Sequence, residues 1–494
     1  MEKYLQLSVH QLVDFLLRTG DIDNRIFNRS TMSEGSRLHS FYQSQQDQSN
    51  YYSEYALKQS FVRNEIQIVL EGRADGIYRR NDGVYVIDEI KTTIEELEDF
   101  YKENKEWHLG QARCYAYMLA IEKNLTEVSI RLTYIRQGKE KEKIQKYFDY
   151  NVLDLEEYVI GLLDDYLAFY NVVLRKQEAR DESIKNLQFP FDNYRKGQRE
   201  IAKYCYSIAK NGGSLFVEAP TGIGKKMSTL FTFIKSFELD NKESIFYLTA
   251  KSSGKESAYN AIKLLKEKGL SLSEIVVTAK DKICFCKGKA CNPDECPFAQ
   301  GYYNKIQTIL NYAIINYSDF NLDTIERIAL ENRVCPFELE LDLSLFCDVI
   351  ICDYNYMYHP ISYMKRYFDE DASHYLALVD ESHNLVDRSR DMYSAAISYS
   401  KFEKAKKSLR HCKVAKIKNL EAKVSKLFKE LNMDYPEGNT VMPAFDNQVY
   451  KVLNNFLNSM QMILKDLSKD VTPELLDFYL DVKFLLDKLK EKLC

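Results

Sequence analysis

The stretch Ser214-Leu215-Phe216-Val217-Glu218-Ala219-Pro220-Thr221-Gly222-Ile223-Gly224-Lys225 decides the fold of the middle of this chain. It reads as an apolar strand that runs into a glycine-rich loop ending in lysine, and a helix should follow from about Lys226 to Lys235. Backbone N–H groups of such a loop point at the phosphates of a nucleoside triphosphate, and the lysine reaches the terminal phosphates. The stretch therefore predicts an ATP site in which residues 221–224 surround the phosphates.

The residue after the loop lysine departs from this pattern. Ser or Thr is usual there, because its hydroxyl binds Mg²⁺, but this chain has Lys226. Ser228 and Thr229 are close in sequence but fall on other sides of the expected helix. We therefore expect a nucleotide site that lacks one metal ligand.

A second motif supports the first. The run Tyr375-Leu376-Ala377-Leu378-Val379-Asp380-Glu381-Ser382-His383 is apolar, long enough for a buried parallel strand, and ends in two acids. Asp380 would hold Mg²⁺ and Glu381 would polarise the attacking water. The alternative is an acid pair that caps the next helix. Strand and helix signals alternate from about residue 194 to 269, with a strand at 244–249, which is typical of a parallel α/β sheet.

Composition sets broad limits. The chain has 494 residues, of which 45% are hydrophobic and 29% charged, as in a soluble globular protein of roughly three domains. The net charge of −5 gives no overall attraction to nucleic acid, so a DNA path would need a local basic strip. We find no apolar stretch that could span a bilayer and no signal-peptide pattern, and we expect a cytoplasmic location.

Five cysteines cluster in the middle of the chain, where a reducing compartment makes a metal site more plausible than disulfides. They are Cys284, Cys286, Cys291, Cys296 and Cys335. Thiolates from all but Cys286 would supply four soft ligands for a [4Fe–4S] cluster or Zn²⁺, and the wide spacings favour the cluster. Cys286 would be spare, although it could replace Cys284; unliganded thiols are the alternative. Cys347 and Cys352 lie in an apolar run and should be core residues.

An N-terminal hairpin brings acids and a lysine together. Two strand candidates, 70–78 and 84–91, flank the turn Asn81-Asp82-Gly83, in which Gly supplies a positive φ. Counting back from a three-residue loop places Asp75 opposite Glu89, and Lys91 shares their side of the sheet. Two carboxylates and a lysine can bind Mg²⁺ or Mn²⁺ and activate water against a phosphodiester. The alternative is a surface salt bridge, although facing acids would repel each other.

Residues 187–400 resemble the front half of a DinG/XPD-type helicase, the iron–sulfur branch of the superfamily 2 DNA helicases. The matching stretches, besides the phosphate loop and the cysteine segment, are Tyr194-Arg195-Lys196-Gly197-Gln198, Leu248-Thr249-Ala250-Lys251, Cys335-Pro336-Phe337-Glu338, Asp353-Tyr354-Asn355-Tyr356 and Asp380-Glu381-Ser382-His383. The family usually has Ala in place of Ser382. The resemblance implies that Arg195 and Gln198 lie near the nucleotide base and that His383 links the ATP state to DNA. It also implies a cluster domain that acts as a wedge, with 5′-to-3′ translocation on single-stranded DNA.

The N-terminal block resembles the RecB-like branch of the PD-(D/E)XK nucleases. Gly35-Ser36-Arg37-Leu38-His39 and Gln111-Ala112-Arg113-Cys114-Tyr115 carry the resemblance beyond the hairpin. It implies that His39 is a third ligand of the divalent ion, although a lone histidine is more often an ordinary helix residue. Gln111 and Tyr115 share one helix face, where they could hold a DNA phosphate or the lysine. Some relatives carry a cluster in this domain, but only Cys114 is present here.

We expect an α/β chain with five segments. They are a nuclease domain (1–178), the first motor domain (179–280 and 341–394), an iron–sulfur insertion (281–340) and a helical arch-like segment (395–494). No second motor domain is apparent, so the sequence reads as the first part of a longer protein or a truncated product. The leading hypothesis is an ATP-dependent DNA helicase fused to a metal-dependent nuclease that acts on single-stranded or forked DNA in repair. The alternatives are a nuclease with a non-translocating helicase remnant and a non-enzymatic DNA-binding fragment.

Overall fold

The structure is a computed structural model that describes ten segments of the chain. They are residues 3–23, 29–137, 142–220, 222–239, 243–360, 362–368, 374–411, 415–434, 446–466 and 472–491. The chain forms two compact units, which are described separately. The first comprises Met1–Asp353 and Asp369–Asp380, and the second comprises Tyr354–Phe368 and Glu381–Cys494.

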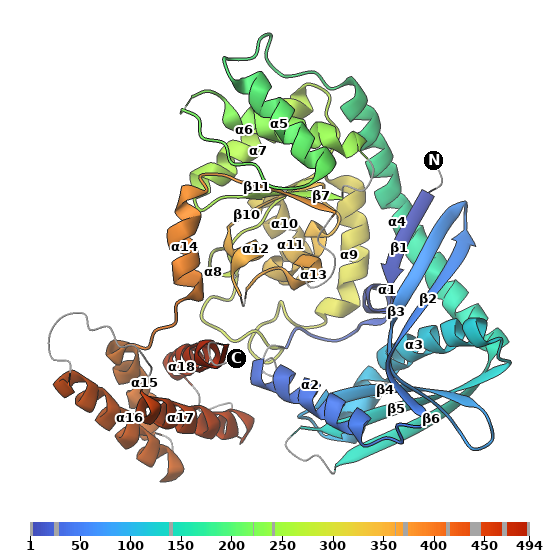
Figure 1. The fold of residues 1–494 in the computed structure, drawn as a ribbon, viewed down its shortest axis with the longest axis vertical. Helices are drawn as coiled ribbons and strands as arrows, with labels where there is room; N and C mark the ends of the chain where they lie inside the picture. The colour runs from blue at the N-terminus through green and yellow to red at the C-terminus, as the bar shows by residue number, and fades with distance from the viewer. Residues whose placement is uncertain are drawn as a thin grey trace. The chain divides into compact units, whose positions relative to one another are not determined.

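The N-terminal part of the first unit is built on one mixed sheet (Figure 1). Its strands are β1 (Lys3–Ser8), β2 (Tyr51–Arg63), β3 (Ile66–Arg79), β4 (Tyr85–Thr93), β5 (Glu127–Arg136) and β6 (Lys143–Asn151). The order is β1-β3-β4-β5-β6, and β2 pairs with β3 along almost its whole length. Because β4 and β5 are parallel, a crossover must join them, and helix α3 (Leu97–Lys123) forms it. The buried side of α3 packs on the sheet and fills the core of this part.

The β3–β4 hairpin has the predicted register. Arg80 N donates to Val84 O at 2.8 Å, and Gly76 pairs with Asp88, so the residue before Gly76 and the residue after Asp88 are level with each other. Gly83 has a φ of 94°, a conformation that favours glycine. The Asn-Asp-Gly turn therefore fixes which side chains share a face of the sheet.

The residues from Leu7 to Arg18 predict a helix, but the helix in the structure is shorter and a strand precedes it. Residues Lys3–Ser8 form β1, which lies parallel to β3, and helix α1 (Val9–Leu17) begins only after Ser8. The Ser8 side chain accepts a hydrogen bond from Gln11 N, and the Gln11 side chain accepts one from Ser8 N. This capping box stops the helix from extending backward, because Ser8 is held in an extended conformation.

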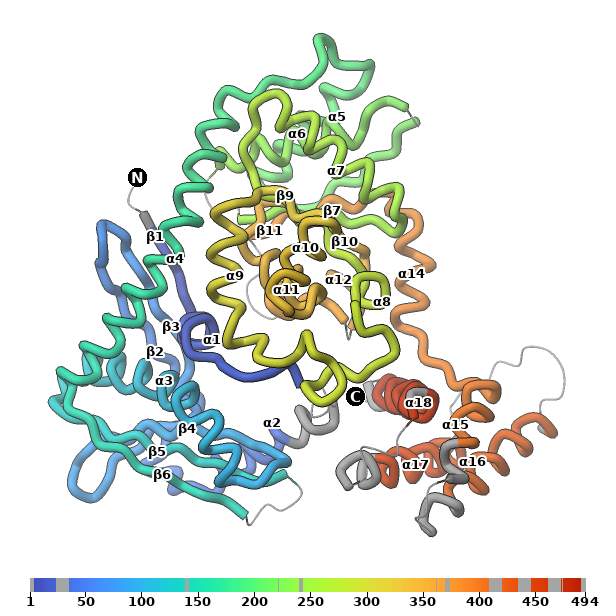
Figure 2. Tube along the Cα trace, turned by 180° about the vertical axis from the view of Figure 1, so that it is seen from behind, coloured from blue at the N-terminus to red at the C-terminus, as the bar shows by residue number. Residues whose placement is uncertain are grey.

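Two further helices complete the N-terminal part. Helix α2 (Arg29–Ser44) carries His39, and helix α4 (Val152–Asn186) is one long helix that leads to the second sheet. Figures 1 and 2 both show α4 lying beside α9 (Tyr302–Asn316), and Lys176 donates to Tyr317 O.

The second sheet is entirely parallel, as predicted, with the strand order β11-β7-β10-β8-β9. The strands are β7 (Ser244–Leu248), β8 (Glu274–Val276), β9 (Asp319–Phe320), β10 (Val349–Cys352) and β11 (Tyr375–Val379). The surrounding helices are α5 (Gln198–Asn211), α6 (Lys225–Lys235), α7 (Ser252–Glu267), α8 (Lys280–Ile283), α10 (Leu322–Asn332) and α11 (Pro336–Ser344), with a 3₁₀ turn at Ser236–Glu238. Cys347 and Cys352 are buried, as expected.

The strand predicted immediately before the phosphate loop does not form. Residues 212–220 have no regular structure, and the Phe216 side chain is 88% exposed. Gly212 and Gly213, with φ of 75° and 104°, turn the chain before this run, and no strand of the described sheet pairs with it. An apolar run becomes a strand only when its backbone groups find a partner. The motif-bearing strand β11 is an end strand of this sheet in which only Leu376 is buried, and not the buried strand that was expected.

The second unit is helical, as predicted for the segment after residue 395. Its helices are α12 (Asn355–Tyr358), α13 (Lys365–Phe368), α14 (His383–Tyr393), α15 (Tyr399–His411), α16 (Ala415–Asp434), α17 (Asn447–Asp466) and α18 (Pro473–Glu491). The last four share their own hydrophobic core, which includes Phe402, Phe456 and Phe478. Among the described residues, no helix has the length and apolar character needed to cross a membrane.

A buried ion pair joins β4 to β5 on the face opposite the predicted site. Arg131 donates to both carboxylate oxygens of Asp88, at 2.9 and 2.5 Å, and Thr133 and Tyr51 also donate to this carboxylate. Asp88 is completely buried. Gly76 makes room for the network, because a Cβ there would lie 1.9 Å from the Tyr51 hydroxyl.

Replacing Asp88 by Ala should destabilise the N-terminal part by about 3–5 kcal/mol, because Arg131 would keep a buried charge without its partner. Urea unfolding followed by circular dichroism measures this. The control is Asp149→Ala, which removes an exposed partner of Arg80 and should leave the transition in place. Equal losses in the two variants would contradict the prediction.

Candidate functional site

The hairpin residues singled out in the sequence lie together on β3 and β4. Lys91 Nζ is 2.6 Å from Glu89 Oε1, and Asp75 Oδ2 accepts a hydrogen bond from Ile90 N at 2.7 Å. His39 reaches the same place from α2, with its Nε2 3.2 Å from Asp75 Oδ2. The structure therefore places two acids, a lysine and a histidine around one point of the sheet.

Glu89 occupies an unusual environment. Its side chain is completely buried, and its Oε2 has no hydrogen-bond partner. Burial raises the pKa of Glu89 to about 8; nearby Lys91 opposes this rise and Asp75 adds to it. At neutral pH this carboxyl therefore retains a proton, which a cation can replace.

Asp75 and Lys91 keep their charges. Burial would raise the pKa of Asp75, but the hydrogen bond from His39 and the charge of Lys91 outweigh it and leave the pKa below its usual value. Burial would lower the pKa of Lys91, but Glu89 and Asp75 raise it above its usual value. Burial also opposes protonation of His39, yet its bond to Asp75 raises the His39 pKa overall. The two facing carboxyls are thus pushed to different protonation states.

Glu54 joins the site although the sequence did not single it out. Ligand atoms of His39, Glu54 and Asp75 all lie within 4.8 Å of one another, an arrangement that could hold a metal ion. Glu54 has a φ of 52°, and the β2–β3 ladder is interrupted where it would face Asp75. The pairing of β2 with β3 places Glu54 opposite Asp75, so Glu54 could have been predicted only if β2 had first been recognised as a strand.

Helix α3 completes this site with the predicted pair Gln111 and Tyr115. Lys91 Nζ donates to Gln111 Oε1 at 3.1 Å, so the glutamine contacts the lysine, one of the two expected alternatives. Gln111 Nε2 is also 3.2 Å from His10 Nε2, a neighbour that sequence reasoning missed. Tyr115 is fully buried against Gly72, where a Cβ would lie 2.9 Å from its ring. Burial and the nearby Glu89 raise the Tyr115 pKa.

The phosphate loop is held by two residues that the helicase resemblance places at the nucleotide. Arg195 donates to Gly222 O, and Gln198 Nε2 donates to Gly224 O at 3.3 Å. Lys225, the first residue of α6, donates to Ala219 O at 2.6 Å. Gly224 has a φ of 84°, and Ile223 lies between the two loop glycines. Thr221 lies outside the described residues.

The acid pair is divided between the two units. Asp380 follows β11 in the first unit, and its Oδ2 is 2.9 Å from Lys226 Nζ. Glu381 belongs to the second unit and has a φ of 52°, with its backbone oxygen accepting from Tyr354 OH at 3.1 Å. His383 begins α14, and its Nδ1 is 3.5 Å from Glu381 Oε2. The N-cap of α14 is Ser382, so neither acid occupies the helix-capping position considered as the alternative.

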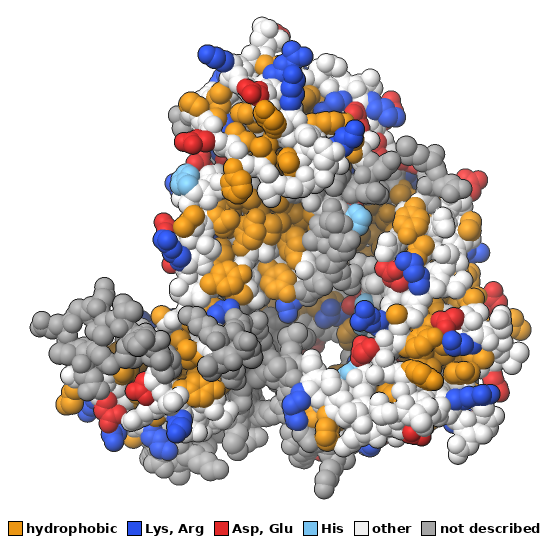
Figure 3. All heavy atoms as spheres, in the orientation of Figure 1, with side chains coloured by type: hydrophobic (Ala, Val, Ile, Leu, Met, Phe, Trp, Pro, Cys, Tyr) orange, Lys and Arg blue, Asp and Glu red, His pale blue; other side chains and the backbone are white. Residues whose placement is uncertain are grey.

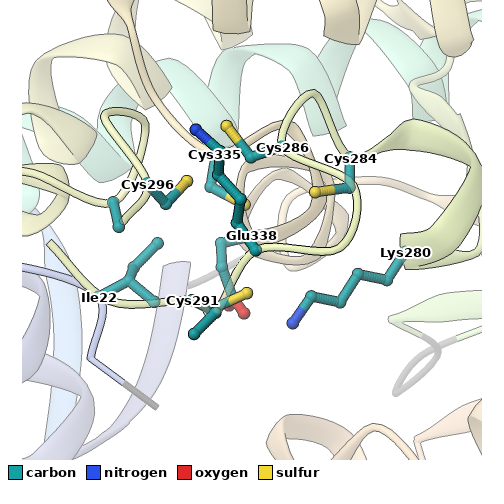
Figure 4. Close-up of a pocket in the computed structure, with 11 residues that line it drawn as sticks. Ile22, Lys280, Cys284, Cys286, Cys291, Cys296, Cys335 and Glu338 are labelled. Atoms are coloured by element: carbon teal, nitrogen blue, oxygen red, sulfur yellow. The ribbon is translucent and has the colours of Figure 1, made fainter. Parts of the chain in front are cut away.

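All five clustered cysteines line one pocket (Figure 4), together with Lys280, Lys289 and Glu338. They are Cys284, Cys286, Cys291, Cys296 and Cys335. Cys296 and Cys335 are 39 positions apart in sequence, yet the fold brings both of them to this pocket. Burial raises the pKa of Cys335 to about 12, so this thiol needs a cation to become a thiolate at neutral pH. Cys286, predicted to be spare, lines the pocket together with the other four.

A segment from the N-terminal part closes one side of this cysteine pocket. Ile22 lines the pocket, and its N donates to Ala299 O at 2.9 Å. Gly20 O accepts from Tyr303 N at 3.1 Å, and the Arg18 guanidinium lies 3.7 Å from the centre of the Tyr303 ring. Nothing in the local sequence around Ile22 indicates this contact, because it depends on residues some 280 positions away.

Charge is mixed on the face drawn in Figure 3, where blue Lys and Arg side chains are interspersed with red Asp and Glu side chains over the described parts. This distribution agrees with the net charge of −5.

Two family models match the chain. Residues 21–207 match the PD-(D/E)XK nuclease superfamily, and residues 258–402 match DEAD_2. The first match includes the hairpin, His39 and Gln111; the second includes all five clustered cysteines and Asp380.

Similar proteins include helicases from distant organisms. The ATP-dependent DNA helicase CHL1 of Candida glabrata is 21% identical over 332 residues, which cover 65% of this chain and 37% of that protein. The ATP-dependent DNA helicase XPD of Sulfolobus acidocaldarius is 24% identical over 286 residues, 57% of this chain and 45% of that protein. A solved XPD helicase has a TM-score of 0.40 at 17% identity, covering 61% of this chain and 51% of its own.

The chain spans less than half the length of these two curated relatives. The family matches therefore show a segment similar to the PD-(D/E)XK nuclease superfamily followed by a segment similar to DEAD_2, and the similar proteins named above are DNA helicases.

Proposed function

We propose that this chain is a DNA-processing enzyme in which a metal-dependent nuclease is joined to a helicase-type segment. The observation that carries the nuclease part is the buried carboxyl of Glu89, without a partner for Oε2, facing Asp75 and Lys91. Such a constellation is expensive for a purely structural role, because facing acids repel and a buried carboxylate lacks solvation. It suits a site where a cation and a phosphodiester supply the missing partners.

The donor set fits Mg²⁺ or Mn²⁺. Carboxylate oxygens of Asp75 and Glu89 are hard ligands, and His39 and Glu54 could complete the coordination. A bound divalent ion would lower the pKa of a water molecule and stabilise charge on the phosphate. Lys91 would orient this water or the scissile phosphate, while Gln111 holds the Lys91 ammonium in place. Tyr115 and Gly72 pack together behind Glu89 and keep the helix close to the sheet.

The helicase-type segment would bind ATP and single-stranded or forked DNA. Lys225 and the loop at residues 222–224 would contact phosphates, and Arg195 and Gln198 would lie near the base. The five cysteines fit a [4Fe–4S] cluster, because soft thiols line one pocket next to the positive side chains of Lys280 and Lys289. We propose 5′-to-3′ movement and a role in DNA repair, because the segment resembles DinG/XPD-type helicases. We propose a cytoplasmic location because the described cysteines are free thiols.

A second candidate is a working nuclease whose helicase-type segment binds DNA without moving along it. Two observations favour it: residues 214–217 do not form the strand before the phosphate loop, and Lys226 pairs with Asp380. Stimulation of ATP hydrolysis by single-stranded DNA distinguishes the two candidates, since only a motor would show it. A non-enzymatic DNA-binding role would require that nuclease activity be missing as well.

Replacing Glu89 or Lys91 by Ala should lower DNA cleavage by about 10²–10⁴-fold, because each removes a group that acts on the metal, the water or the phosphate. Cleavage of labelled single-stranded DNA with Mn²⁺ measures this. Glu71→Ala is the matched control: it lies on β3, the other strand of the hairpin, and also pairs with a lysine, but both side chains are solvent-accessible. Loss of activity in the control, or full activity in Glu89→Ala, would contradict the nuclease assignment.

Metal binding should depend on pH through Glu89. The pKa of Glu89 is about 8, so below that pH the metal must displace a proton from this carboxyl. The affinity for the metal should therefore fall about tenfold for each unit by which the pH is lowered below 8, and it should be constant above pH 8. His39 should steepen the fall at lower pH, since its pKa is also raised. Calorimetric titration with Mn²⁺ on either side of pH 8 tests this. Glu89→Gln should lose the dependence near pH 8, and a slope unchanged by that substitution would count against the assignment.

The cysteine pocket should hold about four iron atoms per chain after purification without oxygen. Cys291→Ser and Cys335→Ser should each lose iron and visible absorption, whereas Cys205→Ser, buried elsewhere, should retain both. Comparing Cys284→Ser with Cys286→Ser identifies the fourth ligand, because only the ligand variant should lose iron. Stoichiometric zinc in place of iron would overturn the cluster assignment.

A further inference from the structure

The nucleotide site contains a lysine where its pattern calls for a metal ligand. Lys226 Nζ lies 2.9 Å from Asp380 Oδ2, the carboxylate that the sequence assigned to Mg²⁺. Lys226 is the second residue of α6, directly after the loop lysine. The ammonium of Lys226 therefore lies next to Asp380, the acid expected to bind the metal. Lys226 also directly follows Lys225, which is expected to bind the phosphates.

No neighbouring hydroxyl on α6 replaces the missing ligand. Thr229 Oγ1 donates to Lys225 O at 3.0 Å, so it is bound to its own helix. Ser228 is completely buried and lies in the helix face that packs into the core. The donor set at this site thus does not fit Mg²⁺, which needs near-octahedral oxygen ligands and would be repelled by the ammonium.

An ordinary surface ion pair is the simplest alternative explanation. Such pairs join flexible side chains in water and contribute little. Here the Asp380 side chain is only 12% exposed, and Lys226 is 31% exposed. Asp380 is also fixed in the sheet, because its N donates to Leu248 O at 2.9 Å. The carboxylate is therefore presented to Lys226 by the strand and helix framework.

We propose that the Lys226 ammonium takes the place of Mg²⁺, so that this site binds nucleotide in its metal-free form. This inference rests on the proposed nucleotide site. Lys225 and Lys226 together bring two positive charges to the phosphates, and Asp380 orients the second of them. An ammonium offers three donors but one charge and no coordinated water. The site is consequently suited to holding ATP and poorly suited to hydrolysing it, which favours the second candidate function, in which the helicase-type segment binds DNA without moving along it.

The test is the affinity for a fluorescent ATP analogue, measured for the full chain with Mg²⁺ and with EDTA. Wild type should bind equally well, within about twofold, under both conditions. Lys226→Ser restores the hydroxyl and removes the ammonium that lies beside Asp380, so its affinity should become about tenfold or more higher with Mg²⁺ than with EDTA. Lys226→Met keeps the length of the side chain without charge or hydroxyl; it should bind at least about tenfold more weakly than wild type in EDTA and gain nothing from Mg²⁺.

The outcomes separate two failures. If wild type and Lys226→Ser both bind and both require Mg²⁺, the nucleotide site stands and the role of Lys226 is overturned. If neither binds ATP in any condition, the nucleotide site itself is overturned and this inference with it. Lys225→Ala should lose binding with and without Mg²⁺, and circular dichroism spectra that match wild type show that each variant is folded.

Discussion

The buried carboxyl of Glu89 is the constraint on which the N-terminal part depends. A carboxyl inside a sheet, opposite a second acid, is tolerated only if the surroundings supply positive charge or a proton. Lys91 supplies the charge, and the raised pKa of Glu89 supplies the proton. Around this point the fold places Gln111 on the lysine and His39 on the second acid. The same strand carries Asp88 on its other face, where Arg131 neutralises it permanently.

Three acid–cation pairs of the first unit illustrate how context separates structure from chemistry. Asp88 and Arg131 are mutually satisfied and sealed, so their pair can only stabilise the sheet. Glu89 and Lys91 leave an oxygen without a partner, which is an opening for a metal ion. Asp380 and Lys226 form an ion pair at the position where the sequence motif predicts a metal ion, and the lysine ammonium lies beside the carboxylate expected to bind that ion. The three pairs contain similar residue types, and they differ in whether the buried carboxylate still has an oxygen without a hydrogen-bond partner.

Much of the candidate site on β3 and β4 could be predicted because a hairpin is a local structure. The Asn-Asp-Gly turn fixes the register, and the register alone makes Asp75 face Glu89. Glu54 and His10 were not found in this way: Glu54 lies on β2, a strand not predicted from the sequence, and His10 reaches the site from α1, 101 positions before Gln111. The apolar run at residues 214–217 shows the opposite error: its composition indicates a strand, but no strand pairs with it in the described sheet.

The sequence by itself determined the elements whose chemistry is local: the phosphate loop, the hairpin with its acids, the parallel strands and the clustered thiols. Only the tertiary structure decided which distant groups complete each site: Ile22 at the cysteine pocket, Glu54 beside the candidate metal ligands, and Lys226 against Asp380. The physical reason is that spacing along the chain fixes geometry only within a turn, hairpin or helix. Contacts between elements depend instead on packing and on burial, which also sets the pKa of Glu89.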